Sequence, residues 1–450
     1  MTIRIGNGCG FWGDNLDAPI NLAERGRLDY LTLEYLAELT MSILALQKQR
    51  KSQAGFATDI LDVIGRLAPQ WRRQPDLKVI TNAGGMNPQA CAAETQAILR
   101  KENLAHMRIG VVSGDDLLPR LDTLLAIGHP LTNMDSGQPL AVIRERIVSA
   151  NAYLGAAPIV EALRLGAQIV ITGRVADASL TVAPAMHEFG WSWNDWGRLA
   201  SATVAGHLIE CGAQATGGLW CHWNEATDLA DVGYPIAEIS SDGNFTIGKP
   251  DGTGGAVNIE TISEQLLYEV GDPKAYLTPD VIADFTSLTL SSCIPNVVSI
   301  QKARGSPAPE KLKVSIAYRN GFSASGTLVV GGPNAAQKAR RGGEMLLDRL
   351  RRAGVMLEHT YVECLGTGDC VPGVIPWTES PEVVLRVAVR DRDRSRVERF
   401  TKEFSPLVTS GPPGFTGYTT GRPTVREVFA YWPALIDRTA VIPSVSLLPM

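Results

Sequence analysis

The sequence predicts an α/β protein with a parallel βαβ sheet core in its N-terminal domain and a smaller α+β C-terminal domain. Over the first two hundred residues, short β-rich runs alternate with segments of helical length, which is the pattern of βαβ units. Gly, Asn or Asp clusters follow these runs. Beyond residue 282, β-rich runs follow one another directly, which indicates antiparallel strands.

The first domain, residues 1–281, contains five strand-helix pairs. We expect strands over 3–6, 28–33, 78–84, 108–116 and 167–174, followed in turn by helices over 17–26, 35–51, 87–102, 117–128 and 178–190. A helix over 195–212 and a turn-rich loop region over 217–255 complete this domain. Loops after parallel strands meet at one edge of a sheet, where ligands bind. The polar loop residues are therefore the candidates for function.

The second domain, residues 282–450, is expected to combine strands with two helices. The strands are expected over 283–290, 296–303, 312–319, 326–332, 360–366 and 383–391, and the helices over 334–354 and 395–405. The segment 410–450 is rich in Gly, Pro and aromatic residues without periodicity. We expect an extended arm that packs over another surface or subunit, which favours a homo-oligomer.

Composition excludes several classes of protein. Lys plus Arg is 42 and Asp plus Glu is 47, giving a net charge of −5 with the signs interspersed. This disfavours a nucleic-acid binder that works by bulk positive charge. No apolar run reaches the roughly 20 residues of a membrane span, and the N-terminus has no signal-peptide core. We expect a cytoplasmic protein that contacts neither membrane nor nucleic acid.

The cysteines and histidines do not form metal-binding motifs. The seven cysteines include no C-x-x-C pair, and the six histidines never occur as H-x-H or H-E-x-x-H. These spacings indicate reduced thiols, Cys293 among them, and neither a zinc site nor a disulfide scaffold. A metal site would therefore have to be built from carboxylates.

A glycine motif follows the first expected strand. Gly8, Gly10 and Gly13 satisfy G-x-G-x-x-G, and Glu34 lies about 20 residues further on, as a ribose-binding acid would. This spacing is consistent with an NAD(P) site. Asp14 stands where pyrophosphate should meet a helix N-terminus, and like charges repel there. We therefore favour a tight turn that presents Asp14 to the sheet edge, with the dinucleotide site as an alternative.

Several carboxylates follow expected strands. Glu34 and Glu38 are four residues apart and would share a helix face. Together they would suit an acid/base pair or a Mg²⁺ site, because neighbouring carboxylates raise one another's pKa. The alternative is that one complements the start of a helix and the other is solvated. Asp14 and Asp135 are further candidate ligands for a divalent metal such as Mg²⁺.

Polar loop residues after other strands are candidates for substrate binding. The segment 81–88, TNAGGMNP, ends a strand and begins a helix with Pro in its first turn, so it leaves backbone N–H groups free for an anion. A glycine turn with an Asn cap is the alternative. The candidate substrate-binding residues are Asn82, Gly84, Gly85, Asp115, Asn133 and Asn151.

Arg174 and Asp177 follow a near-continuous apolar strand. A guanidinium in this position can hold a substrate carboxylate, and Asp177, three residues later, can orient the guanidinium or act as a base. A structural Arg–Asp pair is the alternative. His207 and Glu210 lie three residues apart on one expected helix face, where a carboxylate-oriented histidine can move protons. The candidate catalytic residues are Arg174, Asp177, Glu34 and His207.

Long segments also resemble a known family. They include IRIGNGCGFWGD, VITNAGGMNP, VVSGDDLLPRL, SANAYLGAAPIVEAL, IVITGRVADASL, AGHLIECGAQATGG and GRPTVREVFAYWPALI. The chain is similar to the acyclic terpene utilisation A family (AtuA-type) over nearly its whole length. The resemblance implies an enzyme that acts beside acyl-CoA carboxylases and hydratases on a small branched or polycarboxylic acid or its thioester. Some members of the family carry an extra ferredoxin-like unit at the C-terminus. The resemblance therefore implies that a small partner chain could supply such a unit to this protein.

The leading hypothesis is a lyase of the hydratase/dehydratase type, acting on such an acid or acyl-CoA. An NAD(P)-dependent oxidoreductase that uses Gly8, Gly10 and Gly13 is the alternative. A non-catalytic subunit that binds acyl-CoA is a third possibility. No G-x-S-x-G or Walker A motif occurs, which argues against the α/β-hydrolase and P-loop classes.

Overall fold

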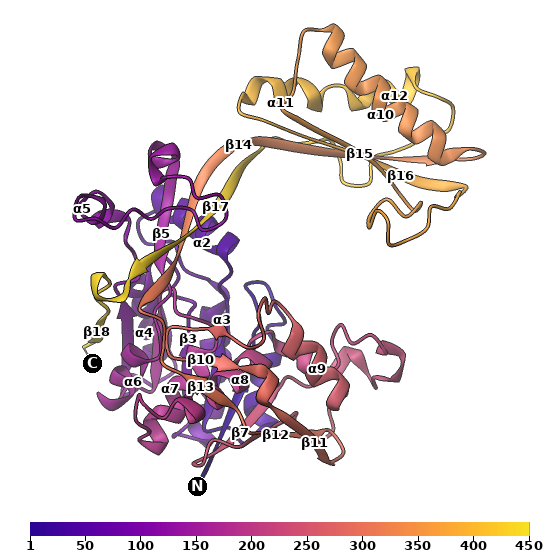
Figure 1. The fold of residues 1–450 in the computed structure, drawn as a ribbon. Helices are drawn as coiled ribbons and strands as arrows, with labels where there is room; N and C mark the ends of the chain where they lie inside the picture. Colours follow the sequence, from indigo (N-terminus) through magenta and orange to yellow (C-terminus); the bar gives the residue numbers. More distant parts are fainter. Residues whose placement is uncertain (450) are drawn as a thin grey trace. The chain divides into compact units, whose positions relative to one another are not determined.

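The fold is described by a computed structural model that covers residues 1–449, apart from the side chain of Cys293 (Figure 1). The thiol expected at Cys293 therefore lies outside the described residues, whereas the other six cysteines are free. The chain forms two compact units, Met1–Ala317 together with the C-terminal residues from Tyr431, and Tyr318–Ala430. The boundary expected at residue 282 falls inside the first unit, because the strands that follow it join the large sheet.

The first unit contains a ten-stranded sheet whose centre is parallel. In spatial order its parallel strands are β1 (Thr2–Asn7), β2 (Tyr30–Leu33), β3 (Lys78–Thr81), β6 (Ile169–Thr172) and β4 (Ile109–Ser113). Antiparallel strands extend both edges: β7 (Ile236–Ser240), β8 (Phe245–Gly248), β12 (Val297–Gln301) and β11 (Thr289–Ile294) beyond β1, and β18 (Ser444–Leu447) beside β4. The predicted parallel core is thus confirmed, within a sheet that is mixed as a whole.

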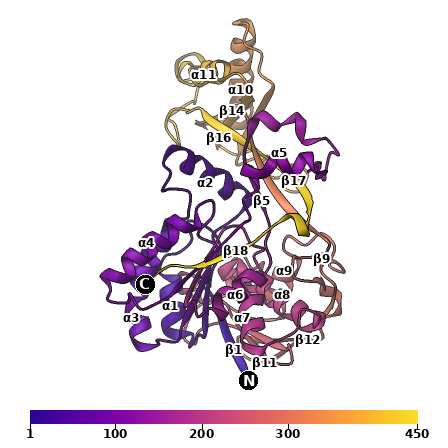
Figure 2. The same ribbon diagram turned by 90° about the vertical axis from the view of Figure 1, so that its left-hand side faces the viewer.

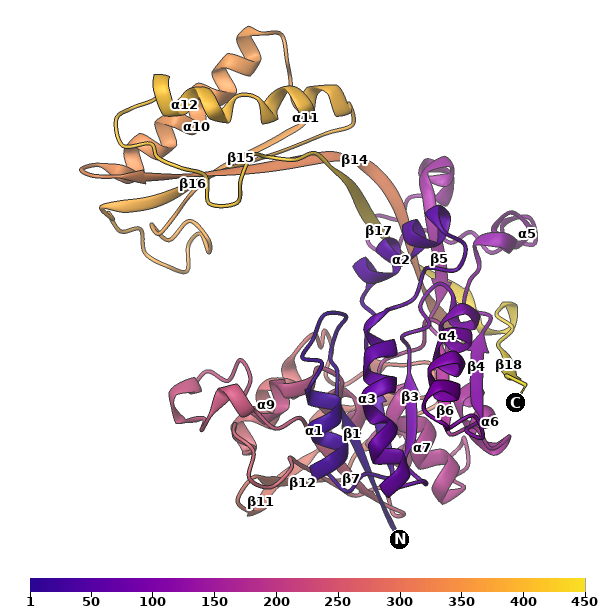
Figure 3. The same ribbon diagram turned by 180° about the vertical axis from the view of Figure 1, so that it is seen from behind.

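Helices cover both faces of this sheet (Figures 2 and 3). One layer contains α1 (Ala18–Arg25), α3 (Asp59–Arg73) and α4 (Pro88–Lys101), and the other contains α6 (Ala157–Arg164), α7 (Ser179–Phe189) and α8 (Trp196–Glu210). Because both faces are covered, the central strands β2 and β6 are buried at every residue, which explains their continuous apolar runs. Because the five core strands are parallel, the loops that follow their C-terminal ends meet at one edge of the sheet.

Several segments differ from the expectation. The region 217–255 contains β7 and β8, not only turns, because its short alternating runs pair as a hairpin. The C-terminal arm contains β17 (Arg426–Asp437) and β18, and β18 pairs with β4 of its own chain. The strand expected over 283–290 is divided between β10 (Ile282–Asp284) and β11. Elements that the sequence analysis did not assign are α3, α6, β5 (Ile147–Ala152), α9 (Ile259–Leu267), β9 (Tyr276–Leu277), β13 (Arg304–Ser306) and α12 (Phe404–Ser410). The assigned helices after β2 and β4 are α2 (Glu38–Arg50) and α5 (Leu121–Ala126).

The second unit packs helices on one face of an antiparallel sheet. Its strands are β15 (His359–Leu365), β16 (Glu382–Asp391) and the later part of β14 (Lys311–Gly331), and its helices are α10 (Ala335–Arg352), α11 (Arg394–Thr401) and α12. Two strands were expected over 312–319 and 326–332, but β14 is one continuous strand, and its pairing with β16 already begins at Phe322, before the second expected strand. A separate apolar core, including Leu328, Leu385 and Phe400, fills this unit.

Asp280 links the starts of two helices in the first unit. One oxygen of this buried carboxyl group accepts a hydrogen bond from Ala156 N at 2.8 Å, just before α6. The other accepts one from Ser179 Oγ at 2.5 Å, at the start of α7. The Asp280 carboxyl group therefore accepts a hydrogen bond from a donor at the N-terminus of each helix, where donors have no acceptor within the helix.

We predict that Asp280→Ala lowers the free energy of unfolding by about 2 to 3 kcal/mol, because it leaves two buried groups without a partner. Urea unfolding followed by tryptophan fluorescence measures this loss. Asp272→Ala, which removes an exposed turn carboxylate, is the control and should change stability by less than about 0.5 kcal/mol. Equal effects of the two substitutions would contradict the assigned role.

Candidate functional site

A cavity of about 980 Å³ opens at the C-terminal edge of the parallel strands. All of its lining residues belong to the first unit. Many of them come from the loops after β1, β2 and β6, from α8 and from the start of β14, and others come from β9, from the loop after β5 and from the segment between α8 and β9. The titratable lining residues are Asp14, Glu34, Glu38, Tyr153, Arg174, Asp177, His207, Glu210, Cys211, Tyr234, Tyr268, Glu269, Tyr276, Lys311 and Lys313. All four residues predicted to be catalytic lie in this one cavity.

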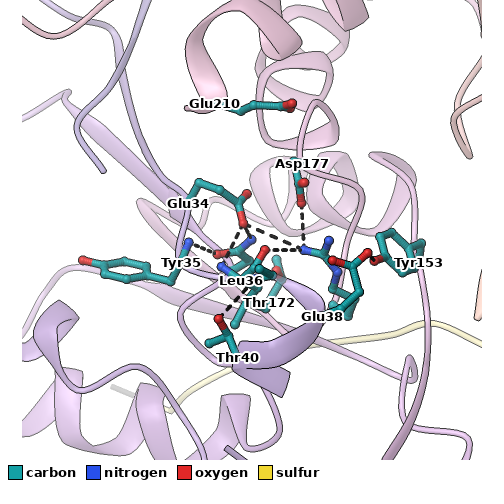
Figure 4. A network of polar contacts seen from close by, with 12 residues as sticks. Glu34, Tyr35, Leu36, Glu38, Thr40, Tyr153, Thr172, Asp177 and Glu210 are labelled. Atoms are coloured by element: carbon teal, nitrogen blue, oxygen red, sulfur yellow. Dashed lines mark hydrogen bonds and ion pairs between the residues drawn. The ribbon is translucent and has the colours of Figure 1, made fainter. Parts of the chain in front are cut away.

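Arg174, which follows β6, is the central charged group of the cavity. Figure 4 shows Glu34, Glu38, Tyr153 and Asp177 in the network of polar contacts around this position. Arg174 is 2% exposed. Its Nη1 donates hydrogen bonds to Asp177 Oδ1 at 2.7 Å and to the Leu36 carbonyl oxygen at 3.1 Å, and lies 3.9 Å from Glu34 Oε1. The guanidinium carbon stacks over the Tyr153 ring at 4.2 Å. Its Nε is buried and has no hydrogen-bond partner among the described residues, which leaves one guanidinium donor unpaired.

Asp115 holds the backbone of Arg174 through a buried hydrogen bond. Asp115 Oδ2 accepts hydrogen bonds from Arg174 N at 2.9 Å and from Asn151 Nδ2 at 2.8 Å. A Cβ atom at Gly173 would collide with the same carboxyl group, which explains the glycine between strand and arginine. Asp115 and Asn151, both predicted to bind substrate, do not line the cavity. They position the loop that carries Arg174.

Asn82 has a similar positioning role for Glu34. Its Nδ2 donates to Glu34 Oε1, and its Oδ1 accepts from Tyr35 N at 2.8 Å. Leu36 N also donates to Glu34 Oε1, at 3.0 Å. The second carboxyl oxygen of Glu34 is buried and has no partner in the described chain. Asn82 was predicted to contact substrate, whereas in the structure it holds the acid that lines the cavity.

Glu38, Tyr153 and Lys313 form a second polar group beside Arg174. Tyr153 Oη donates to Glu38 Oε1 at 2.7 Å, and Lys313 Nζ lies 3.2 Å from the same oxygen. Burial acts to raise the pKa of Glu38, but the hydrogen bond from Tyr153 and the charge of Lys313 lower it to about 2. Glu38 is therefore a fixed negative charge rather than a proton carrier.

The pKa values of Glu34 and Asp177 are raised, whereas that of Glu38 is lowered. Burial and the charge of Asp177 raise the pKa of Glu34, by more than the charge of Arg174 lowers it. Burial also raises the pKa of Asp177, against the opposing charge and hydrogen bond of Arg174. The Asp177 side chain is 32% exposed, and it lines the cavity. Two carboxyl groups beside one guanidinium thus favour a state in which one of them carries a proton.

His207 and Glu210 form a separate pair on α8. His207 Nδ1 lies 3.2 Å from Glu210 Oε1, and His207 Nε2 lies 2.9 Å from the Gln265 carbonyl oxygen. Burial raises the pKa of Glu210 to about 7, while the hydrogen bond and charge of His207 oppose this rise. The cavity therefore contains a second acid that can exchange a proton at neutral pH.

Four other predicted residues lie outside the cavity lining. Gly84 packs against the Thr172 carbonyl group, and Gly85, with φ of 49°, packs against Leu44. Asn133 accepts hydrogen bonds from the backbone N–H groups of Asp135 and Ser136 and so caps its own loop. Asp135 is exposed. The anion cradle expected at 82–85 is therefore a tightly packed turn. Its glycines are explained by the close approach of neighbouring atoms, which leaves no room for a Cβ atom.

The glycine motif after β1 also packs against protein. A Cβ atom at Gly8 would lie 2.7 Å from Pro19 Cα, and one at Gly10 would lie 2.8 Å from the Cys211 carbonyl carbon. The Gly10 N–H group donates to Asp14 Oδ2 at 2.8 Å. Helix α1 begins at Ala18, five residues after Gly13. These contacts do not favour NAD(P), because pyrophosphate needs free N–H groups at a helix start directly after the glycines.

The two predicted metal ligands are not brought together. Asp14 lines the cavity and accepts hydrogen bonds from Gly10 N and Tyr234 Oη, whereas Asp135 is exposed on another loop. Over residues 1–449 there is no group of three or more His, Cys, Asp or Glu side chains arranged to hold a metal ion. The geometry therefore does not favour a Mg²⁺ site at these two aspartates.

Sequence reasoning missed three residues that shape the cavity. Lys313 lies on β14, and nothing in its local sequence distinguishes it from a surface lysine. Tyr276, on β9, stacks on the His207 ring with centroids 5.4 Å apart. Tyr153 could have been found, since it follows β5 in the same way that the predicted residues follow their strands.

These features define an α/β protein with a mixed sheet that collects a buried arginine and several acids at the C-terminal edge of its parallel centre. Residues 3–447 match the family model described as acyclic terpene utilisation family protein AtuA, and the chain belongs to this family. A comparison with curated proteins finds no match. Among solved structures, the chain is similar to the de novo designed protein Ferredog-Diesel, with 14% identity and a TM-score of 0.16, over 24% of this chain and 88% of that chain.

Family membership indicates a role in acyclic terpene utilisation. Within the described chain, no helix has both the length and the apolar character needed to cross a membrane.

We predict that Asp115 makes stability fall as pH rises. Burial raises the pKa of Asp115 from 3.8 to about 6, although hydrogen bonds from Arg174 N and Asn151 lower it. Because the folded chain then binds more protons than the unfolded chain, stability decreases between about pH 4 and pH 6. Asp115→Asn should reduce this decrease by up to about 3 kcal/mol.

Urea unfolding at pH 4, 5, 6 and 7 measures the slope. Asp122→Asn alters an aspartate whose side chain is 79% exposed and serves as the control, which should keep the wild-type slope. An unchanged slope in Asp115→Asn would show that Asp115 is not protonated in the folded protein.

Proposed function

We propose that this chain is a lyase of the hydratase/dehydratase type, acting on a small branched or polycarboxylic acid or its acyl-CoA thioester. The observation that carries the proposal is the group formed by Arg174, Glu34 and Asp177 in one cavity. Arg174 offers a fixed positive charge with an unpartnered donor. Glu34 and Asp177 offer carboxyl groups with raised pKa values.

These groups match the chemical needs of water elimination. When a 3-hydroxy acid or thioester loses water, a proton leaves the carbon next to the carbonyl group and negative charge grows on the carbonyl oxygen. Arg174 would stabilise that charge, and the ionised member of the Glu34–Asp177 pair would accept the proton. Hydration is the same sequence in reverse.

The size of the cavity supports an elongated substrate. Ligand pockets commonly span about 300 to 1,000 Å³, and this one, at about 980 Å³, lies at the upper end of that range. Its lining combines the charged groups with apolar side chains, namely Leu36, Leu219, Leu277, Leu312 and Leu435. A substrate with one anionic or thioester end and a branched hydrocarbon body would contact both parts. The expected homo-oligomer, small partner chain and cytoplasmic location stay predictions.

We predict that carboxylates or acyl-CoA thioesters raise the melting temperature of the protein, and that NAD(P)(H) does not, because ligands stabilise the state they bind. Arg174→Lys should weaken binding by about 10- to 100-fold, since it replaces a planar donor by a point charge while keeping the charge balance of the buried acids. Thermal-shift titrations measure both effects.

Arg144→Lys is the matched control, since Arg144 also lies 2.7 Å from an aspartate oxygen but on the surface. It should bind ligands as the wild type does. Stabilisation by NAD(P)(H) alone, or unaltered ligand binding in Arg174→Lys, would contradict the proposed function.

A further inference from the structure

Elimination of water needs two proton transfers, and the Arg174 group accounts for the one at carbon. The second must reach the departing oxygen, because hydroxide is a poor leaving group. Among the described cavity residues that the proposed mechanism does not use, the His207–Glu210 pair combines burial, a fixed hydrogen-bond geometry and an unpartnered oxygen. It is therefore the group to test for this second transfer.

The hydrogen bonds of His207 determine where its protons lie. Nε2 is 2.9 Å from the Gln265 carbonyl oxygen, which can only accept, so Nε2 carries a hydrogen. Nδ1 faces Glu210 Oε1 at 3.2 Å. A hydrogen bond between these two atoms then needs one proton, on either Nδ1 or the carboxyl group. The pair thus stores one shared proton.

The surroundings of His207 keep the imidazole in place. Its side chain is 2% exposed. The rings of Tyr276 and Phe285 lie on it with centroid distances of 5.4 and 5.3 Å. Gln265 Nε2 also donates to the His207 carbonyl oxygen at 3.2 Å. His207 is consequently suited to hold and orient Glu210 rather than to move toward a substrate.

Glu210 differs from His207 in its access to the cavity. Its Oε1 faces the imidazole, whereas its Oε2 is buried and lacks a hydrogen-bond partner among residues 1–449. A buried carboxyl oxygen without a partner is costly unless a ligand supplies one. The Glu210 side chain is 13% exposed, against 2% for His207, and Glu210 lines the same cavity as Arg174 and Asp177. A substrate held by Arg174 therefore shares its cavity with the Glu210 side chain.

We propose that Glu210 is the catalytic acid that protonates the departing hydroxyl group, and that His207 is its positioning residue. This inference rests on the proposed function. In dehydration, the Cα–H bond breaks, its electron pair forms the C=C bond, and its proton passes to the Glu34–Asp177 pair. The Cβ–O bond breaks, and the proton that Glu210 Oε1 shares with His207 Nδ1 passes from Oε1 to the departing oxygen to form water, which leaves Glu210 as a carboxylate beside a neutral His207. The two proton transfers balance and the enzyme returns to its starting charge.

The charged neighbours of Glu210 support proton storage at neutral pH. Asp177, Glu269, Tyr276 and Cys211 face it from the surrounding elements. The nearby carboxylates Asp177 and Glu269 add to the rise that burial causes in the pKa of Glu210, which lies at about 7. An acid with a pKa near the working pH transfers protons efficiently in both directions.

The test separates the two proton transfers with 3-hydroxybutanoyl-CoA as the probe. Exchange of the Cα hydrogens with deuterium oxide, followed by NMR, reports the transfer at carbon. Formation of the enoyl product reports both transfers. We expect Glu210→Gln to keep exchange within about threefold of wild type and to lose dehydration by about 100-fold or more. Asp177→Asn should lose both.

Two further arms identify the acid by its chemistry. The 3-fluorobutanoyl thioester loses fluoride, which departs without a proton, so Glu210→Gln should eliminate fluoride at close to the wild-type rate. His207→Gln should shift the pH profile of dehydration, because it removes the group that shares the proton. Glu225→Gln is the matched control, since His222 and Glu225 have the same i, i+3 spacing but are exposed.

The outcomes distinguish this inference from the proposed function. If Glu210→Gln loses exchange and dehydration together, or neither, or if fluoride loss falls as far as water loss, then Glu210 is not the acid. If the wild-type protein catalyses neither exchange nor dehydration of the probe, the proposed function fails, and the inference fails with it.

Discussion

The buried charge of Arg174 is the constraint on which the rest of the cavity depends. Burying an unpaired ion costs several kcal/mol even after relaxation, so a guanidinium that is 2% exposed must be paired on most sides. Asp177, the Leu36 carbonyl group and the Tyr153 ring contact it, and Glu34 lies close by. Glu34 and Leu36 follow β2 and Asp177 follows β6 of the large sheet, whereas Tyr153 follows β5, which pairs with β14. The need to neutralise one cation therefore fixes those loops relative to one another.

The same constraint explains the acid chemistry of the cavity. Two carboxyl groups compete for one guanidinium, and burial raises the pKa of both Glu34 and Asp177. The result is a cavity that holds fixed positive charge and stored protons at the same place. Asp115 and Asn82 do not line the cavity. They form hydrogen bonds with the Arg174 backbone and the Glu34 carboxyl group, respectively. The site thus has an inner layer that faces ligand and an outer layer that keeps it in position.

Much of this arrangement could be predicted from sequence, because the parallel sheet brings strand-end loops to one edge. That rule placed Glu34, Arg174 and Asp177 together correctly. It could not tell which polar side chain faces the cavity and which faces the protein, so it wrongly predicted that Asn82 and Asp115 contact the substrate. It also could not find Lys313, which β14 brings back from far along the chain to a place beside Glu38. Such contacts depend on tertiary register, which no local pattern in the sequence records.

Infrared difference spectroscopy tests the central claim most directly, because the carbonyl stretch of a protonated carboxyl group is distinct from the bands of a carboxylate. The measurement is a pH titration of the full chain, wild type against Glu34→Gln, with Glu225→Gln as an exposed control. A proton held by the Glu34–Asp177 pair predicts a protonated-carboxyl band in the wild type at pH 7 that diminishes in Glu34→Gln and persists in the control. Absence of that band at pH 7, or an equal band in Glu34→Gln, would contradict this assignment.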